Sequence, residues 1–113
     1  MFTELTAGGK TYMLRLTTRG IIQLEKDLGY NPLQIFMGID EDVLPRLGDM
    51  LKLLHRTLQP LNHGITYEDA IDIYDAFLQE DGHTVWDIVP ILIDVFKEAG
   101  FLPKDEDAAE PKN

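Results

Sequence analysis

The side chains best suited to catalysis or metal binding in this sequence are three histidines and many carboxylates. His55, His63 and His83 are widely spaced, and they form no His-x-x-x-His pair that would place two metal ligands on one helix face. Serine and cysteine, the usual nucleophiles of covalent catalysis, are both absent. We therefore predict no catalytic residue, no metal ligand and no cofactor site, and we expect that the protein is not an enzyme.

Two local patterns begin like ligand-binding motifs but lack their key residues. Asp40 and Asp42 are spaced like the start of a calcium loop, but the glycine and the distant glutamate of that loop are missing. We expect these aspartates to cap a helix instead. Gly8-Gly9 lacks the lysine and the following helix of a phosphate-binding loop. This pair predicts a tight turn.

The formal net charge of −10 is concentrated in the second half of the chain. Residues 1–65 hold equal numbers of acidic and basic residues, whereas residues 66–103 hold nine acids and a single lysine. Such an acidic surface repels phosphate backbones, so we do not expect nucleic-acid binding. The charge either serves only to keep the protein in solution or meets a basic partner, and both interpretations stay open here.

Length and composition predict one soluble intracellular domain. A chain of 113 residues with 44% hydrophobic content is typical of a single globular domain. No apolar run approaches the eighteen or so residues of a membrane span, so we expect no membrane association. The first residues lack the basic-then-apolar layout of a signal peptide. We expect the domain to cover residues 1–103.

Residues 2–16 predict a β-hairpin. Segments 2–6 and 10–16 flank Gly8-Gly9, which supplies the positive φ angles of a tight turn. An isolated hairpin is only marginally stable in water, so this one must pack on helices or pair with strands of a neighbour. Its exposed edge would allow self-association.

Two helices are predicted to follow the hairpin. Either residue of the Thr17-Thr18 pair can cap a helix over about 18–28, which Gly29 ends by adopting the left-handed conformation. An Asn-Pro pair then begins a short helix over 32–37, because proline suits the first helical position.

The longest predicted helix spans residues 43–59. Its leucines recur at spacings of three and four, which predicts one buried side: Leu44, Leu47, Leu51, Leu54 and Leu58. Barely two heptads are present, so we favour a packed core helix over a coiled coil.

Two capped helices are predicted in the last part of the chain. Thr66 and Asp69 resemble a capping box before a helix over 67–79, and Thr84 with Asp87 begins the final helix in the same way. The first of these helices carries an acid row without basic residues four positions away, namely Glu68, Asp72 and Asp75. The final helix is apolar almost all round, so it is either fully buried or presents one face to a partner.

The predicted fold is therefore mainly α: a compact bundle of about four to five helices preceded by an N-terminal β-hairpin. Residues 104–113 are polar, charged and without large apolar groups, so we predict a disordered, flexible acidic tail.

Three strings in the chain resemble the tail assembly chaperones of long-tailed, siphovirus-type bacteriophages of Gram-positive hosts. They are LRLTTRGIIQLEKDLGYNPL at 14–33, LNHGIT at 61–66, and the apolar closing helix that ends in Ala99-Gly100-Phe101. The resemblance covers roughly residues 10–102 and fades in the tail. None of these strings is a catalytic motif.

The resemblance implies a role in virion assembly in the cytoplasm of an infected bacterium. Such chaperones coat the tape measure protein and keep it soluble and extended while tail tube subunits assemble, and they are absent from the mature virion. Many are also made as a longer form by programmed frameshifting, and its extension is thought to recruit the major tail protein. A flexible tail at 104–113 would accept such an extension.

We place the partner-binding site in an apolar groove on the final helix. The groove would be lined near Trp86, Ile91 and Leu92 and bordered by the acid row Glu68, Asp72 and Asp75. Two alternatives stay open: a small acidic nucleic-acid mimic that inhibits a DNA-binding protein, and a structural tail or connector protein retained in the virion.

Overall fold

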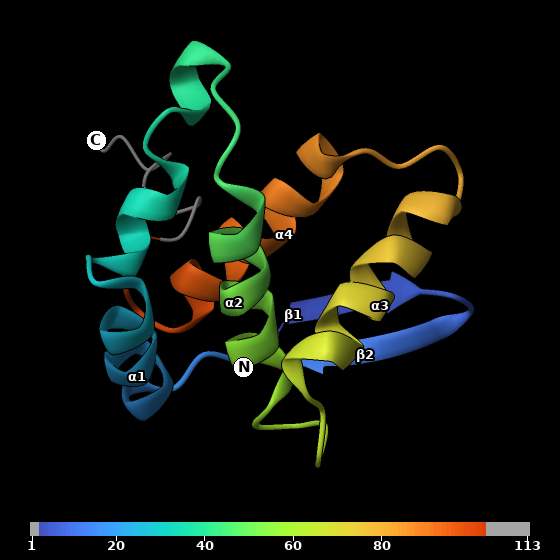
Figure 1. Ribbon diagram of the computed structural model, residues 1–113, viewed down its shortest axis with the longest axis horizontal. Coiled ribbons are helices and arrows are strands. Elements are labelled where there is room, and N and C mark those ends of the chain that lie inside the picture. The colour runs from blue at the N-terminus through green and yellow to red at the C-terminus, as the bar shows by residue number, and fades with distance from the viewer. Residues whose placement is uncertain (1–2, 104–113) are drawn as a thin grey trace, which may run out of the picture.

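Helix α2 (Leu47–Leu58) lies at the centre of the computed structural model, which describes residues 3–103. Figure 1 shows α1 (Thr18–Leu28) on one side of it, and α3 (Tyr67–Gln79) with the hairpin on the other. Helix α4 (Val85–Glu98) crosses behind α2. The predicted tail at 104–113 lies outside the described residues.

The predicted hairpin is confirmed. Strands β1 (Thr3–Ala7) and β2 (Lys10–Leu14) pair antiparallel, from Thr3 opposite Leu14 to Ala7 opposite Lys10. Gly8 and Gly9 form the two-residue turn with φ angles of 61° and 76°, which residues with a Cβ rarely adopt. Strand β2 ends at residue 14, two residues earlier than predicted.

The hairpin packs on the helices through one face. Leu5, Ala7 and Leu14 are buried on this face, against helices α2, α3 and α4. The turn is also fixed, because the Gly9 N–H donates a hydrogen bond of 2.9 Å to Glu80 Oε2 at the end of α3. The helices therefore supply the tertiary support that an isolated hairpin lacks.

Helix α1 begins and ends as predicted. Thr17 caps it by accepting a hydrogen bond of 2.9 Å from the Gly20 N–H. Gly29 ends it in the left-handed conformation, with its N–H bonded to the Glu25 carbonyl. The short helix that follows is a 3-10 helix, η1 (Pro32–Phe36), one residue shorter than predicted.

The helix predicted over 43–59 begins only at Leu47. Pro45 explains this, because a proline disfavours helical conformation in the residue before it. Of the five leucines predicted to form the buried side, only Leu51, Leu54 and Leu58 are buried. Leu44 and Leu47 are exposed by 43% and 49%. Among residues 3–103 the longest helix is α4 rather than α2.

The connection between η1 and α2 contains a second short 3-10 helix, η2 (Ile39–Glu41). The prediction that Asp40 or Asp42 caps the next helix is wrong, because Arg46 occupies the cap position of α2 and forms no side-chain cap bond. Asp42 instead adopts a left-handed conformation with a φ angle of 62°.

Both predicted capping boxes are present, and they begin α3 and α4. In α3 the hydroxyl of Thr66 accepts from the Asp69 N–H, and the carboxylate of Asp69 accepts from the Thr66 N–H. Thr84 and Asp87 form the same motif in α4.

The predicted class, helices with an N-terminal hairpin, is thus confirmed. Within residues 3–103, no helix is both long and apolar enough to span a membrane.

Candidate partner-binding surface

The outer side of α4 presents an apolar strip flanked by carboxylates. Trp86 is 41% exposed. Pro90 and Ile93 follow at helical spacing on the same side, Pro90 exposed and Ile93 half-buried. Asp87 and Asp94 are exposed beside them. We call these five residues the α4 outer face.

The capping box fixes the position of Trp86. Its backbone N–H donates a hydrogen bond of 3.2 Å to the Thr84 hydroxyl, and the Thr84 N–H donates one of 2.7 Å to Asp87 Oδ2. The first turn of α4 is therefore well ordered by local bonds. Trp86 therefore extends from a turn whose backbone is held by these bonds, which suits an interface anchor.

The structure corrects the predicted lining of the groove. Leu92 has no exposed surface and belongs to the core, together with Ile88 and Phe96. Ile91 is half-buried and packs against that core. The final helix is therefore not fully enclosed. Its most apolar side faces inwards, its outer side keeps only the narrow apolar strip, and only Trp86 among the three predicted contacts is exposed.

The predicted acid row is exposed but does not run beside Trp86. Glu68, Asp72 and Asp75 all face solvent on α3. Helices α3 and α4 pack mainly on β1 and α2 rather than on each other. Figure 1 shows the first turn of α3 near the C-terminal end of α2 and the first turn of α4 towards the N-terminal end of α2. The row and Trp86 are therefore not the two sides of one groove.

A second apolar surface, which the sequence analysis missed, lies between η1 and α2. Its exposed side chains are Met37 at 74%, Val43 at 56%, Leu44 at 43% and Leu47 at 49%. We call residues 37–47 the 37–47 loop. The signal that could have found it is Pro45, which excludes Leu44 from a regular helix.

The 37–47 loop has a defined shape. The Val43 N–H donates a hydrogen bond of 2.8 Å to the Gly38 carbonyl and closes the loop. Gly38 is required there, because a Cβ at this position would lie 2.5 Å from the Cβ of Val43. The tip carries three exposed acids without an ion pair among residues 3–103, namely Asp40, Glu41 and Asp42.

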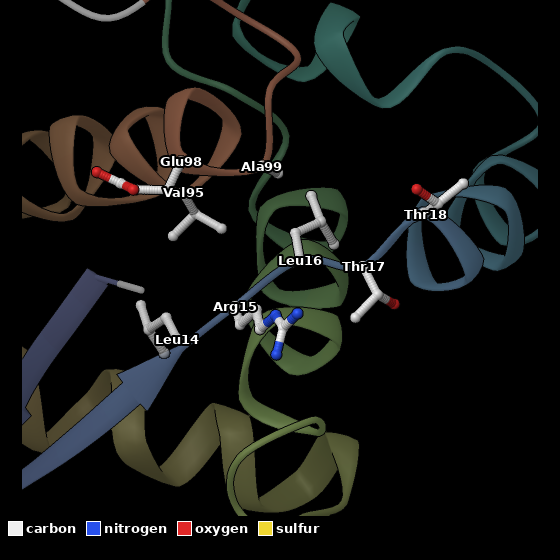
Figure 2. Close-up of a pocket in the computed structure, with 8 residues that line it drawn as sticks. All are labelled: Leu14, Arg15, Leu16, Thr17, Thr18, Val95, Glu98 and Ala99. Carbon is white, nitrogen blue, oxygen red and sulfur yellow. The ribbon is translucent and has the colours of Figure 1, made fainter. Parts of the chain in front are cut away.

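A pocket of about 280 Å³ lies between the segment that joins β2 to α1 and the last turns of α4. Figure 2 shows Leu14 and Leu16 on the side facing α4, while Arg15 and Thr17 point away from this helix. The Thr17 hydroxyl already accepts the helix-cap hydrogen bond. The pocket is therefore packing space beside the core and does not assemble a nucleophile with a base.

Two of the three histidines, His55 and His83, and the tyrosine Tyr30 form contacts that tie parts of the fold together. A ring nitrogen of His55 lies 3.0 Å from the Ile65 carbonyl, and one of His83 lies 3.0 Å from the Phe77 carbonyl. Burial, with the nearby carboxylate of Asp49, raises the pKa of Tyr30 to about 12. Among residues 3–103, no group of three or more potential ligands could hold a metal ion.

The chain was compared with family models, curated proteins and solved structures. The model of a family described as "Family of unknown function (DUF6096)" matches residues 3–113. No curated protein and no solved structure matches the chain.

Proposed function

The chain belongs to the DUF6096 family, whose function is unknown, and we propose that it is a bacteriophage tail assembly chaperone that binds and coats the tape measure protein. The observation that carries the proposal is the α4 outer face, where an exposed tryptophan on a rigid helix is flanked by carboxylates. The resemblance of residues 14–33, 61–66 and 99–101 to such chaperones supplies the identity of the partner.

The α4 outer face suits a helical partner with apolar and basic residues. Trp86, Pro90 and Ile93 form a narrow strip against which the apolar side of an amphipathic helix can lie. Asp87 and Asp94 would meet lysine or arginine beside that strip, which sets orientation more than affinity. A tape measure protein is largely helical and offers many such segments in one chain.

Many weak contacts along one long partner would hold firmly without a deep groove. One exposed tryptophan with a few neighbours gives a small interface, which is typical of weak binding. Several copies on a single tape measure protein would add their contacts through avidity. This arrangement would keep the partner soluble and extended, and it needs no catalytic centre.

The chaperone would act in the cytoplasm of the infected bacterium and be absent from the mature virion. A frameshifted longer form, extended beyond residue 113, would recruit the major tail protein to the complex.

A second candidate function is favoured by one observation. The row Glu68, Asp72 and Asp75 lies on the solvent side of α3 and has no ion pair within the described part of the chain. A row of unpaired carboxylates on one face suits a nucleic-acid mimic that blocks a DNA-binding protein. Tight, salt-sensitive binding to basic DNA-binding proteins would favour this function over the chaperone.

The decisive experiment is co-expression with the tape measure protein of the same phage. We expect the wild-type chain to keep that protein soluble and to co-purify with it in several copies. Trp86→Asp is expected to abolish both effects, because it places a charge at the centre of the apolar strip. Leu61→Asp is the matched control, since Leu61 is 42% exposed at a different site.

Three results would contradict the proposal. They are failure of the wild type to solubilise the tape measure protein, an equal loss with Leu61→Asp, and recovery of the protein from purified virions, which would indicate a structural connector. Circular dichroism of both variants verifies that they fold. Ile91 is unsuitable for this test, because it packs against the core.

A further inference from the structure

Three arginines lie near one another where α1 begins beside the end of α2. Arg19 and Arg56 line a pocket of about 280 Å³ together with Thr17. Arg15 lies two residues before Thr17 in the extended segment after β2, so both side chains are on one side of this segment, as Figure 2 shows. The Arg15 N–H also donates a hydrogen bond of 2.8 Å to the Thr57 carbonyl in the last turn of α2. We call Arg15, Arg19 and Arg56 the arginine cluster.

The arginine cluster carries positive charge that the described part of the chain does not balance. Arg15 and Arg19 are exposed and form no ion pair with any residue in the range 3–103. Arg56 donates a hydrogen bond of 2.8 Å to Asp27 Oδ2, so one of the three charges is balanced. Among residues 3–103, no acid lines the pocket that Arg19 and Arg56 share. The cluster is therefore a locally basic surface on a chain whose formal net charge is −10.

The ten residues after Pro103 have the opposite composition. Segment 104–113 holds four acids, three of them consecutive at 105–107, and two lysines. Only residues 99–103 separate this segment from the end of α4, and Glu98 and Ala99 line the pocket of Figure 2 together with Arg15 and Thr17.

The segment is long enough to reach the arginine cluster. Thr17 lines both the pocket of Figure 2 and the pocket beside Arg19 and Arg56, so the two pockets are neighbours. The end of α4 lines the first of them. Ten extended residues span at most about 33–36 Å, which exceeds the width of two pockets of this size. An acidic segment thus begins one pocket away from a surface with unbalanced positive charge.

We propose that segment 104–113 docks through its carboxylates on the arginine cluster of its own chain. Guanidinium groups recognise carboxylates through paired, charge-assisted hydrogen bonds, and the exposed side chains of Arg15 and Arg19 supply the donors. The docked segment occupies the cluster and competes with any other acidic ligand for it. This contact is separate from the proposed chaperone function, because it uses no residue of the α4 outer face.

The covalent connection makes a weak contact sufficient. A short connection gives the segment an effective concentration in the millimolar range at its site. Exposed ion pairs are individually weak, and salt screens them further. We therefore expect the contact to be populated at low ionic strength and largely lost in about 0.5 M sodium chloride.

The test is paramagnetic relaxation enhancement in the full chain. The sequence contains no cysteine, so Ala109→Cys carries a nitroxide at one position only. In a nitrogen-15-labelled sample, we expect the nitroxide to broaden the amide signals of residues 15–20 and 56–59. The signals of residues 68–75, on α3, are expected to broaden less. Absence of broadening at residues 15–20 would overturn the proposal.

Charge reversal tests whether the arginines hold the segment. Arg15→Glu with Arg19→Glu is expected to reduce the enhancement at residues 56–59 at least about threefold, because it places acids opposite the acids of the segment. Lys10→Glu with Arg46→Glu is the matched control, since it makes the same change of charge at two exposed bases outside the cluster. Equal reductions by the two pairs would overturn the proposal, because they would indicate general attraction only.

A mixed sample distinguishes docking within one chain from docking between copies. Nitroxide-labelled chain without nitrogen-15 is mixed with nitrogen-15-labelled chain without nitroxide. At about 0.1 mM we expect almost no broadening, because the effective concentration within one chain is far higher. Broadening at residues 15–20 as strong as in the doubly labelled chain would overturn the proposal, since the segment would then bind a second copy.

Neutralising the acids of the segment changes no residue in the range 3–103, so the described fold keeps its sequence. This variant is expected to lose the broadening, and its substitutions are Asp105→Asn, Glu106→Gln and Asp107→Asn. Its control neutralises the acid row of α3 and is expected to keep the broadening, with Glu68→Gln, Asp72→Asn and Asp75→Asn. Loss of broadening in both variants would overturn the proposal.

Competition tests the consequence of docking. A synthetic peptide of residues 104–113 is titrated into the wild type and into the variant with neutralised acids at 105–107, and the amide shifts of residues 15–20 are followed. We expect the variant to bind the peptide at least about twofold more tightly, because its own segment no longer occupies the cluster. Equal binding by the two chains would overturn the proposed occupancy.

Discussion

The first turns of α4 and α2 are held in place by different kinds of contact. In α4, the Thr84 N–H donates to the carboxylate of Asp87, three residues along the chain, at 2.7 Å. In α2, the cap residue Arg46 forms no side-chain cap bond. Instead Asp49 in the first turn accepts a hydrogen bond of 2.5 Å from the hydroxyl of Tyr30, which lies 19 residues earlier.

This difference separates local from tertiary control of a helix start. A capping box depends only on residues within one turn, so α4 begins at a point that its own sequence determines. The bond between Tyr30 and Asp49 requires α1, the turn after it and α2 to be in place together. The start of α2, and with it the exposure of the 37–47 loop, is therefore set by the whole fold.

The largest expected effect comes from comparing a buried leucine in the middle of α2 with an exposed leucine just before this helix. Leu54→Ala is expected to lower the free energy of unfolding by about 2–5 kcal/mol, because Leu54 has no exposed surface and its loss leaves a cavity. Leu44→Ala is expected to change it by less than about 0.5 kcal/mol, as at other exposed sites. Urea denaturation measures both. Similar losses at the two leucines would mean that residue 44 is packed.

The contrast between these leucines shows what could be predicted from the sequence. The hairpin, α1, α3 and α4 were predictable, because each is bounded by a glycine turn or a threonine cap that acts over a few residues. Leu44 and Leu54 share one apolar periodicity, and periodicity alone cannot show where the helix begins. Pro45 carries that information, because a proline disfavours helical conformation in the residue before it.

The candidate site was less predictable than the fold. Trp86 is exposed whereas Leu92 is buried, because an apolar helix does not reveal which side the rest of the chain covers. The 37–47 loop was missed for a related reason. Its exposure depends on where η1 and α2 lie relative to each other, which no local pattern specifies.

The second prediction removes the tertiary contact at the start of α2. Tyr30→Phe is expected to lower the free energy of unfolding by about 1–3 kcal/mol, because it leaves the buried carboxylate of Asp49 without its hydroxyl donor. Tyr12→Phe is the matched control, since it removes a hydroxyl from a half-buried ring of the hairpin. An equal loss in both variants would contradict the role given to the Tyr30–Asp49 bond.

The contact between Tyr30 and Asp49 also makes the free energy of unfolding depend on pH in the alkaline range. The pKa of Tyr30 is raised to about 12 in the folded chain, against an ordinary value near 10. The folded state therefore holds the phenolic proton more tightly, and this stability is complete below pH 10 and lost as pH rises towards 12. We expect the wild type to lose stability more steeply than Tyr30→Phe over this interval in urea titrations.

The third prediction concerns the start of α4, which the Thr84 cap fixes through local hydrogen bonds. Thr84→Ala is expected to lower the free energy of unfolding by about 1 kcal/mol, because the Trp86 N–H loses its cap acceptor. Arg46→Ala, at the equivalent position of α2, is expected to have almost no effect on thermal stability, since Arg46 forms no side-chain cap bond and its 3.8 Å ion pair with Asp49 is largely exposed on the arginine side. Comparable losses would mean that both helix starts are fixed locally.

The smallest expected effect lies in the capping box of α3. The hydrogen bonds from the Thr66 backbone and side chain lower the pKa of Asp69 below its ordinary value. The folded chain therefore binds this proton less readily than the unfolded chain. The resulting stability is present above the ordinary carboxyl pKa, near 3.9, and is lost as pH falls through the lower folded value.

Asp69→Asn tests this acid dependence, because its amide oxygen can still accept the bond from the Thr66 N–H but does not titrate. We expect the urea midpoint of the wild type to fall more than that of Asp69→Asn between pH 5 and pH 3. Asp72→Asn, which removes a charge from the exposed side of the same helix, corrects for the general effect of lower negative charge. If Asp69→Asn and Asp72→Asn alter the pH profile equally, the cap does not control the titration of Asp69. The start of α3 would then depend on packing against α2 and β1, just as the start of α2 depends on Tyr30.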